Sequence, residues 1–310
     1  MNHGGMAVAL VGPTASGKSA LAHHVARERA DTEVLSVDAM TVYRGMDLGT
    51  AKPSVRERAE VRYHLLDLVD PADEFTLAQF QSHARTALDE VWLDGAAALY
   101  VGGTGLYGRA VLDDLEIPGQ FPEVRSALET RAASSLLELY EQLRSLDPVA
   151  ASRMEPANAR RVVRALEVCL GSGRTFSSYG DGLLRYGPVH VVQIGLDVEL
   201  DELDARIERR FYEWMDQGLL EEVARLANAP RGLGRTARQA VGYRQLLAHV
   251  EQGVALEDCV SDALRQSRRL ARRQRSWFRR DPRVEWFSDL DQARRRLFEV
   301  LSSPDGFVRD

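Results

Sequence analysis

The chain is poor in cysteine, in lysine and in long apolar runs. Its two cysteines, Cys169 and Cys259, stand in helical patterns without the spacing of a metal site, so no zinc centre is indicated. The first apolar run, residues 7–11, is followed at once by Gly-Pro and is too short for a signal peptide or a membrane span. We therefore expect a cytoplasmic protein with reduced, buried thiols and no membrane partner.

The scarcity of lysine makes two positions informative. Among the 40 basic residues only Lys18 and Lys52 are lysine, so arginine is used wherever a generic positive charge suffices. At these two positions we expect a need for a compact ammonium rather than a planar guanidinium. Lys18 belongs to a motif described below. For Lys52 an ordinary surface lysine is an equally good interpretation.

Charge is unevenly distributed along the chain. The composition, 45% hydrophobic and 28% charged, suits a globular protein with a full core, and the net charge of −6 taken alone argues against nucleic acid. Residues 265–280, however, hold no acidic residue, and on a helix their arginines fall within roughly 160° of one face. This arginine strip consists of Arg265, Arg268, Arg269, Arg272, Arg273, Arg275, Arg279 and Arg280. It predicts contact with a phosphate backbone, whereas a solvated charged face would normally interleave acids.

The stretch GPTASGKS fits the phosphate-loop pattern G-x-x-x-x-G-K-[ST]. It follows an apolar run, 7–11, that predicts a buried strand, and a helical pattern follows it. Backbone N–H groups of such a loop surround a diphosphate, the lysine adds a positive charge, and the hydroxyl can bind Mg²⁺. The predicted phosphate site comprises Gly12, Pro13, Thr14, Ala15, Ser16, Gly17, Lys18 and Ser19, with Ser19 as the metal ligand.

Short apolar runs alternate with helical patterns over most of the chain. Strands are predicted at 7–11, 34–37, 97–101, 189–196 and 284–287, with a weaker one at 64–69. This alternation predicts an α/β fold with a parallel sheet flanked by helices, of the P-loop NTPase type. We expect a core of residues 1–116 and 189–310 and an all-helical insertion at 117–188. Four C-terminal helices are predicted at 199–217, 219–227, 235–250 and 256–280.

Three loops should meet at the carboxyl ends of the strands: the phosphate loop, 38–41 and 102–105. Asp38 follows a strand, where a Mg²⁺-associated carboxylate, a catalytic base or a turn cap is expected. Asp197 follows another, but a helix N-cap is the better interpretation there. Arginines 206, 209 and 210 share one helix face, which suits either a diphosphate or ordinary salt bridges. Arg160, Arg161 and Arg164 share a face in the insertion.

Eight segments, in the same order, are similar to the tRNA dimethylallyltransferases, also called tRNA isopentenyltransferases or the IPP transferase family. The segments are GPTASGKSALA, SVDAMTVYRGMDLGTAKP, HLLDLVDPADEFTLAQF, LYVGGTGLYGRAVL, PANARRVVRALEV, RIERRFYEWMDQGLLEEV, TARQAVGYRQL and LARRQRSWFRR. The resemblance implies transfer of a dimethylallyl group from dimethylallyl diphosphate to the N6 amine of the adenosine 3′ of the anticodon, position 37 of tRNA.

The resemblance also implies roles for individual residues. Asp38 would accept the N6 proton, Thr14 and Arg206 would assist catalysis, and Arg210 would join the phosphate loop in binding the departing diphosphate, with Mg²⁺ at Ser19. The implied contacts with the tRNA anticodon stem-loop are Asp38, Ala39, Met40, Thr41, Thr104, Arg125, Arg160, Arg161, Arg164, Gly242, Tyr243, Arg244, Arg272, Arg273, Gln274, Arg275 and Arg279. We expect a monomer.

One departure and three alternatives accompany this hypothesis. The family usually has glutamine where Thr41 stands, so the way in which the adenine edge is bound becomes doubtful. A P-loop small-molecule kinase would share the loop and the sheet but would not need the arginine strip. A prenyltransferase acting on free adenine nucleotide would need neither the strip nor the insertion. A nucleotide-gated RNA-binding module would not need Asp38 together with Arg206 and Arg210.

Overall fold

The computed structural model describes residues 5–180, 183, 185–187, 189 and 191–303. The chain divides into two units, a larger one from residues 1–113 and 186–310 and a smaller one, Asp114–Arg185. The predicted insertion, 117–188, began and ended slightly later, and residue 188 lies outside the described residues. Each unit has its own hydrophobic core and is described separately.

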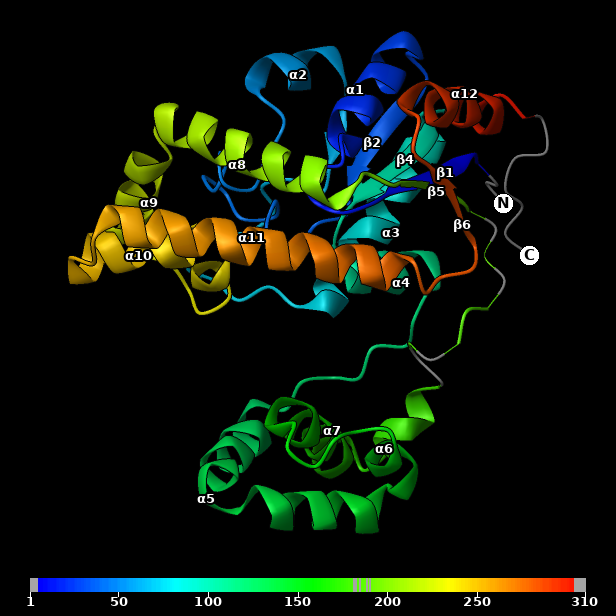
Figure 1. Ribbon diagram of the computed structural model, residues 1–310. Coiled ribbons are helices and arrows are strands. Elements are labelled where there is room, and N and C mark those ends of the chain that lie inside the picture. The colour runs from blue at the N-terminus through cyan, green and yellow to red at the C-terminus, as the bar shows by residue number, and fades with distance from the viewer. Residues whose placement is uncertain (1–4, 181–182, 184, 188, 190, 304–310) are drawn as a thin grey trace. The chain divides into compact units, whose positions relative to one another are not determined.

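The larger unit is built on a six-stranded sheet in which every strand pair is parallel, with the order β3-β2-β4-β1-β5-β6. Its strands are β1 (Ala7–Val11), β2 (Thr32–Ser36), β3 (Tyr63–His64), β4 (Ala97–Gly102), β5 (Val192–Leu196) and β6 (Val284–Phe287). The predicted fold class, a parallel sheet flanked by helices, is confirmed (Figure 1).

Two strand predictions differ from the structure. The strand expected at 64–69 is only Tyr63–His64, because Leu65 and Asp67 adopt positive φ angles of 65° and 55° and interrupt the extended backbone. Val69 forms an isolated parallel β-bridge with Tyr43 and is not part of a strand. The strand expected at 189–196 is Val192–Leu196, and its predicted start includes residue 190, which lies outside the described residues.

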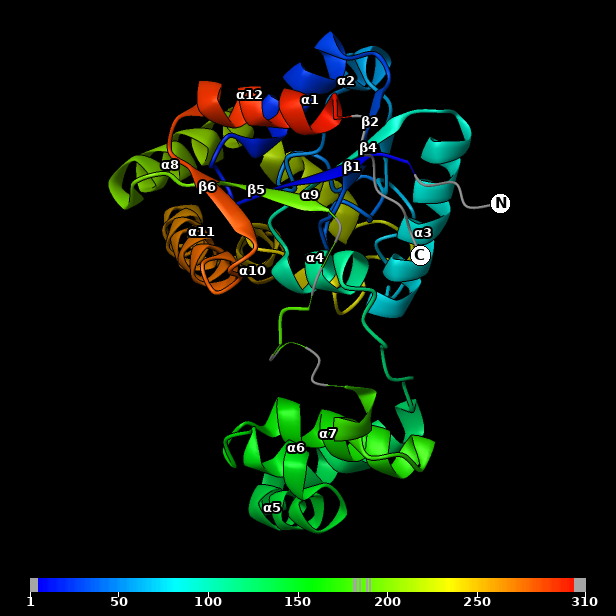
Figure 2. The ribbon, with the colours of Figure 1, turned by 90° about the vertical axis from the view of Figure 1, so that its right-hand side faces the viewer.

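Alternate side chains of the central strands face two hydrophobic cores. Val8 and Leu10 of β1 pack with α1 (Lys18–Glu28) and α12 (Leu290–Leu301) on one face of the sheet. The opposite face packs against α3 (Leu77–Leu93), α4 (Gly105–Leu112) and the C-terminal helices, where Ala7, Ala9 and Val11 lie. Figure 2 shows β1 between these two helical layers. A short helix, α2 (Val55–Glu60), begins with a capping box at Ser54 and Glu57.

The C-terminal helices are α8 (Leu200–Asp216), α9 (Leu219–Ala227), α10 (Tyr243–Gln252) and α11 (Leu256–Phe278). The single helix predicted at 235–250 is wrong in its first half. Residues Ala237–Gln239 form one 3₁₀ turn, η3, and Gly242 has a φ of 92°, a conformation that glycine adopts without strain. The helix therefore begins only at Tyr243, and the residues just before it remain free to line a cavity.

The smaller unit is helical, with α5 (Pro122–Leu146), α6 (Pro148–Ser152), α7 (Ala159–Ser172) and the 3₁₀ turn η1 (Phe176–Tyr179). Its core packs α5 against α7 through leucines 128, 139, 143 and 166. Helix α5 has a kink at Ser135, whose φ of −137° and ψ of 42° are not helical.

Candidate functional site

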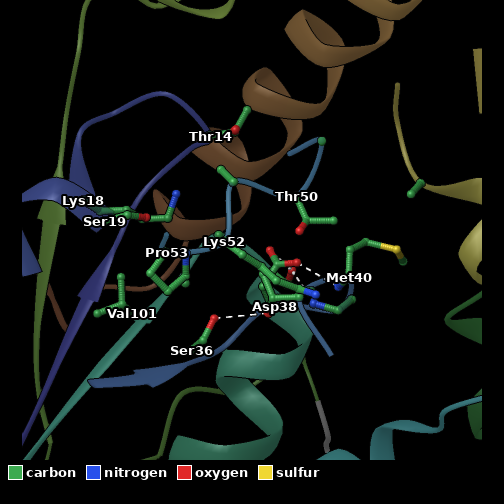
Figure 3. Close-up of a pocket in the computed structure, with 18 of the residues that line it drawn as sticks. Thr14, Lys18, Ser19, Ser36, Asp38, Met40, Thr50, Lys52, Pro53 and Val101 are labelled. Carbon is green, nitrogen blue, oxygen red and sulfur yellow. Dashed lines mark hydrogen bonds between the residues drawn. The ribbon is translucent and has the colours of Figure 1, made fainter. Parts of the chain in front are cut away.

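A cavity of about 530 Å³ lies where the phosphate loop, the loop after β2 and the loop after β4 meet. Thr14, Lys18 and Ser19 line it from the phosphate loop, and Asp38 and Met40 from the loop after β2 (Figure 3). Helices α8 and α11 and the segment before α10 complete the wall with Arg210, Trp214, Gln239, Ala240, Val241, Leu270, Arg273 and Gln274. The structure thus brings together the three loops that the strand ends predicted.

The phosphate loop carries a partly buried cation at the mouth of α1. Lys18 is the first residue of that helix, and its Nζ donates to the Pro13 carbonyl at 3.1 Å. Burial and the nearby Arg210 lower the pKa of Lys18 to about 8, although Asp38 acts in the opposite direction. An anion bound beside Lys18 would stabilise its charged form, which burial disfavours. This is the property expected of a lysine in a phosphate-binding loop.

Arg210 is a second buried cation at the same loop. Its Nη2 donates to Thr14 Oγ1 at 2.6 Å, and its guanidinium lies 4.6 Å from the centre of the Trp214 ring. Within the described ranges no carboxylate forms an ion pair with it, and its Nε is buried without a hydrogen-bond partner. Burial lowers the pKa of Arg210 to about 10. This side chain is therefore prepared for an anionic ligand.

Gln274 of α11 reaches the phosphate loop directly. Its Oε1 accepts a hydrogen bond of 2.8 Å from the Thr14 amide. Its Nε2 lies where a side chain at Gly103 would have to go, because a Cβ atom built there would be 2.8 Å away. A side chain at position 103 would therefore displace the end of Gln274, and the helix that carries the arginine strip is hydrogen-bonded to the phosphate loop.

The loop after β2 directs the Asp38 carboxylate into the cavity. Oδ1 accepts from the Met40 amide at 2.8 Å, and Oδ2 accepts from the Thr104 hydroxyl at 3.2 Å. The predicted turn cap is therefore present, and one carboxylate can both cap the turn and face Lys18. Thr41 lines the cavity but is only 5% exposed, and its hydroxyl lies 3.2 Å from that of Ser36.

The structure separates Arg206 from this cavity. Its Nε donates to Glu202 at 2.7 Å, and the side chain lines a second cavity of about 260 Å³ behind the phosphate loop. Arg209 is exposed and lies 4.0 Å from Glu213. The expectation that arginines 206, 209 and 210 point the same way is wrong, because each is held by different neighbours, and only Arg210 enters the main cavity.

Among the described residues, five of the eight arginines in the strip are paired with acids, four of them with acids outside α11. Arg268 bonds Glu208 at 2.6 Å and Arg272 bonds Asp204 at 2.7 Å, both across to α8, while Arg265 pairs with Asp262. Arg275 and Arg279 pair with Asp197, which is not the N-cap expected, since α8 begins after Glu199. Burial would raise the pKa of Asp197, but hydrogen bonds from these two arginines hold it below its usual value.

The remaining members of the strip are differently placed. In the described part of the chain, Arg269, Arg273 and Arg280 make no ion pair, and all three are exposed. Arg273 also lines the main cavity. These three side chains, rather than all eight, are available to a polyanion without the loss of an existing partner.

The predicted tRNA contacts before α10 are only partly accessible. Tyr243 is fully buried, its hydroxyl donates to Glu222, and its ring packs against Gly49. Gly242 is buried as well, whereas Arg244 is exposed. Ala240 and Val241, which the sequence did not single out, line the cavity instead. The break in the helix at Gly242 was the signal that could have indicated them.

In the smaller unit, Glu167 organises two of the predicted arginines. Its side chain has no exposed surface, and it accepts from the Phe121 amide at 2.8 Å. Arg125 and Arg164 place their Nη1 atoms 3.3 Å and 2.9 Å from its carboxylate. Arg160 and Arg161 are exposed on the same helix as Glu167.

The described residues offer no cluster of metal ligands and no helix suited to a membrane. They contain no group of three or more histidine, cysteine or acidic side chains that could hold a metal ion. Ser19 is exposed in the first turn of α1 beside the cavity. Among the same residues no helix combines the length and the apolar composition needed to cross a membrane.

The chain is similar to known proteins over almost its whole length. Residues 41–281 match the family model described as IPP transferase. The tRNA dimethylallyltransferase of Kineococcus radiotolerans is 45% identical over 307 residues, which cover 95% of this chain and 96% of that protein. The tRNA dimethylallyltransferase of Bifidobacterium animalis subsp. lactis is 43% identical over 296 residues, 94% of this chain and 84% of that protein.

Solved structures give the same result. The tRNA isopentenylpyrophosphate transferase of Bacillus halodurans superimposes with a TM-score of 0.68 at 35% identity and covers 96% of each chain. A eukaryotic dimethylallyltransferase acting on tRNA reaches a TM-score of 0.75 at 23% identity, which shows a shared fold. That superposition covers 93% of this chain and 75% of the other.

Proposed function

The chain belongs to the IPP transferase family, and on this premise we propose that the cavity transfers a dimethylallyl group from dimethylallyl diphosphate to tRNA. The acceptor is the N6 amine of the adenosine 3′ of the anticodon, position 37. The bond between the allylic carbon and the diphosphate oxygen breaks, a bond between that carbon and N6 forms, and N6 loses one proton. The observation that carries the proposal is the shared cavity of Asp38, Lys18 and Arg210.

The phosphate loop and Arg210 bind the diphosphate that departs. Negative charge grows on the leaving oxygens as the carbon–oxygen bond breaks, and groups already aimed at that position stabilise it without reorganisation. Lys18 and Arg210 both have lowered pKa values because they are buried, and Arg210 Nε has no partner in the described residues. Thr14 orients Arg210 through their hydrogen bond of 2.6 Å. Arg206 lies outside this cavity and lines the second cavity together with Ser16 of the loop.

Asp38 accepts the proton from the adenine amine. The N6 lone pair is delocalised into the ring, so removal of a proton as the new bond forms makes the amine a better nucleophile. Thr104 holds Oδ2 and the Met40 amide holds Oδ1, which fixes the carboxylate toward the cavity. The base must leave its stack to reach this position.

The residues present fit a magnesium ion that is bound mainly by the oxygens of the diphosphate. Ser19 is an exposed hydroxyl at the start of α1, and it lines the same cavity as Asp38. Mg²⁺ commonly combines one or two protein oxygens with phosphate oxygens and water. When bound, the ion would add positive charge at the diphosphate. We assign Ser19 as its protein ligand.

The tRNA is bound by cations on both units. In the larger unit Arg273 lies at the cavity and Arg269, Arg280 and Arg244 are exposed, while Arg272, Arg275 and Arg279 can exchange carboxylates for phosphates. In the smaller unit the side chains are Arg125, Arg160, Arg161 and Arg164. Because tRNA is a cytoplasmic substrate, we place the protein in the cytoplasm.

A donor competition tests the function. Purified protein is given unmodified tRNA, dimethylallyl diphosphate and Mg²⁺, with ATP as a competing donor, and the nucleosides are analysed by mass spectrometry. We expect an N6-dimethylallyl adenosine at the position 3′ of the anticodon and no phosphorylated product. A free-nucleotide control distinguishes prenylation of tRNA from prenylation of adenine nucleotides. A phosphorylated product, or modification of free nucleotide alone, would refute the proposal.

A further inference from the structure

The two lysines of the chain line the same cavity, but the reaction described above uses only Lys18. The Lys52 side chain is 1% exposed, so its interpretation as an ordinary surface lysine is wrong. A buried ammonium is unfavourable unless every N–H has an acceptor. The surroundings of Lys52 therefore show what it holds in place.

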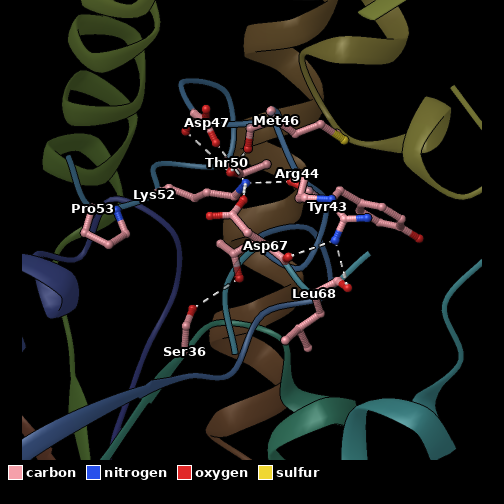
Figure 4. Close-up of polar contacts among 12 residues, drawn as sticks. Ser36, Tyr43, Arg44, Met46, Asp47, Thr50, Lys52, Pro53, Asp67 and Leu68 are labelled. Carbon is pink, nitrogen blue, oxygen red and sulfur yellow. Dashed lines mark hydrogen bonds and ion pairs between the residues drawn. The ribbon is translucent and has the colours of Figure 1, made fainter. Parts of the chain in front are cut away.

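Lys52 has three acceptors for its three N–H groups. Its Nζ lies 2.6 Å from the carbonyl oxygen of Tyr43, 2.9 Å from Asp47 Oδ1 and 2.6 Å from Asp67 Oδ1 (Figure 4). The donors of an ammonium diverge in three directions, whereas those of a guanidinium lie in one plane. An arginine could not satisfy the same three acceptors from this position, which explains why this arginine-rich chain has a lysine here.

Asp67 continues the connection toward the site. Its Oδ2 accepts from Arg58 at 2.6 Å, and its own backbone N–H donates to the Thr41 carbonyl at 3.1 Å. Burial would raise the pKa of Asp67, but hydrogen bonds from Lys52 and Arg58 hold it below its usual value. The carboxylate stays ionised, and the backbone of residue 67 is fixed beneath Thr41.

Thr41 and Tyr43 belong to the segment that begins with Asp38. Lys52 thus reaches this segment twice, directly at the Tyr43 carbonyl and through Asp67 at the Thr41 carbonyl. The Met40 amide, between them and Asp38, holds the carboxylate. We propose that Lys52 is the positioning residue for Asp38. It fixes segment 38–53 so that the carboxylate faces the phosphate loop, an inference that rests on the proposed role of Asp38 as the base.

The main test replaces Lys52 with arginine, which keeps the charge and loses the geometry. We expect turnover to fall roughly 10- to 100-fold, because a displacement of the order of 1 Å of a reacting group has effects of this size. KM for dimethylallyl diphosphate should stay within about three-fold, since no bond to the phosphate loop is lost. Amide hydrogen exchange should rise in segment 38–53 and stay unchanged in residues 12–19. Arg56→Met, at a side chain 88% exposed, is the matched control and should change none of these.

The Asp38→Ala variant and the double variant Asp38→Ala/Lys52→Arg separate this inference from the proposed function. If Lys52 acts through Asp38, its replacement causes no further loss of turnover once Asp38 is gone. Losses that multiply, or a normal rate and normal exchange for Lys52→Arg, would overturn the inference. A full rate for Asp38→Ala would instead overturn the proposed base. Should Lys52→Arg not fold, Asp47→Asn weakens one of the three bonds at a carboxylate 53% exposed, and should lower turnover a few-fold with the same rise in exchange. Unchanged turnover in that variant would also count against the role of Lys52.

Discussion

Replacement of Lys18 by methionine should remove diphosphate binding and change how the stability of the free protein depends on pH. The pKa of Lys18 is lowered from 10.5 to about 8, chiefly by burial. The shift corresponds to about 3 kcal/mol, and contact of the side chain with water reduces this to about 2 kcal/mol. Below pH 8 the folded protein carries this full cost, because the lysine is charged in both the folded and the unfolded states. Between pH 8 and 10.5 the unfolded state binds the proton and the folded state does not, so the cost disappears as pH rises.

The expected outcome follows from that sign. As pH rises from 7 to 10.5, the free energy of unfolding of the wild type should increase by about 2 kcal/mol relative to that of the Lys18→Met variant. At pH 7 the variant avoids the cost of about 2 kcal/mol for the buried charge but loses about 1 kcal/mol with the hydrogen bond to Pro13. It should therefore be more stable than the wild type by about 1 kcal/mol. Urea unfolding followed by circular dichroism, without phosphate in the buffer, measures both values, and Ser19→Ala is the control in the same loop. A difference that stays constant with pH, or that moves the other way, would refute the reasoning.

Three further predictions concern the same cavity. Asp38→Ala should lower turnover by a factor of roughly 10² to 10⁴ and leave tRNA affinity nearly unchanged, as single-turnover kinetics and filter binding can check. Arg273→Ala should weaken tRNA binding and reduce the slope of log affinity against log salt concentration by about one. Arg272→Ala should reduce the affinity and the slope less, because Arg272 is already paired with Asp204. Salt titrations of both variants compare them, and equal slopes would contradict the distinction. Gln274→Leu should weaken inorganic pyrophosphate binding in calorimetry, because the Thr14 amide loses its acceptor; unchanged affinity would argue against that bond as support for the loop.

The sequence predicted the elements whose signals are local. The phosphate loop has fixed spacing, and the strand at 284–287 was expected with the bounds that the structure has. Periodicity also located α8, α9 and α11 to within a few residues. These predictions succeeded because hydrophobic alternation and turn residues act over a few positions along the chain. The roles of the site residues remain proposals, although the cavity collects the predicted loops.

The errors concern pairings between distant segments. Residues 265–280 contain no acid, and Asp262 just before them pairs with Arg265, but α8 supplies Asp204 and Glu208 from more than fifty positions earlier in the chain. No local pattern shows that two helices will lie together. The environment of Lys52 was missed for the same reason. Asp67 contacts Lys52 because the chain turns after β3 through residues with positive φ angles, which the sequence did not indicate. Tertiary packing decides such contacts, and local patterns in a single sequence do not show which residues of two distant segments will become neighbours.

Pairing of the arginine strip has a consequence for how the protein samples RNA. A phosphate that approaches Arg268 or Arg272 must displace a carboxylate, so a passing RNA gains little from those positions. An anticodon arm that fits the whole surface can compensate for every exchange at once. If the strip binds the anticodon arm as proposed, the same carboxylates also compete with the modified RNA for Arg268 and Arg272, which favours release of the product. On that proposal, discrimination and release have one common origin, competition between the acids and the RNA backbone for the same guanidinium groups.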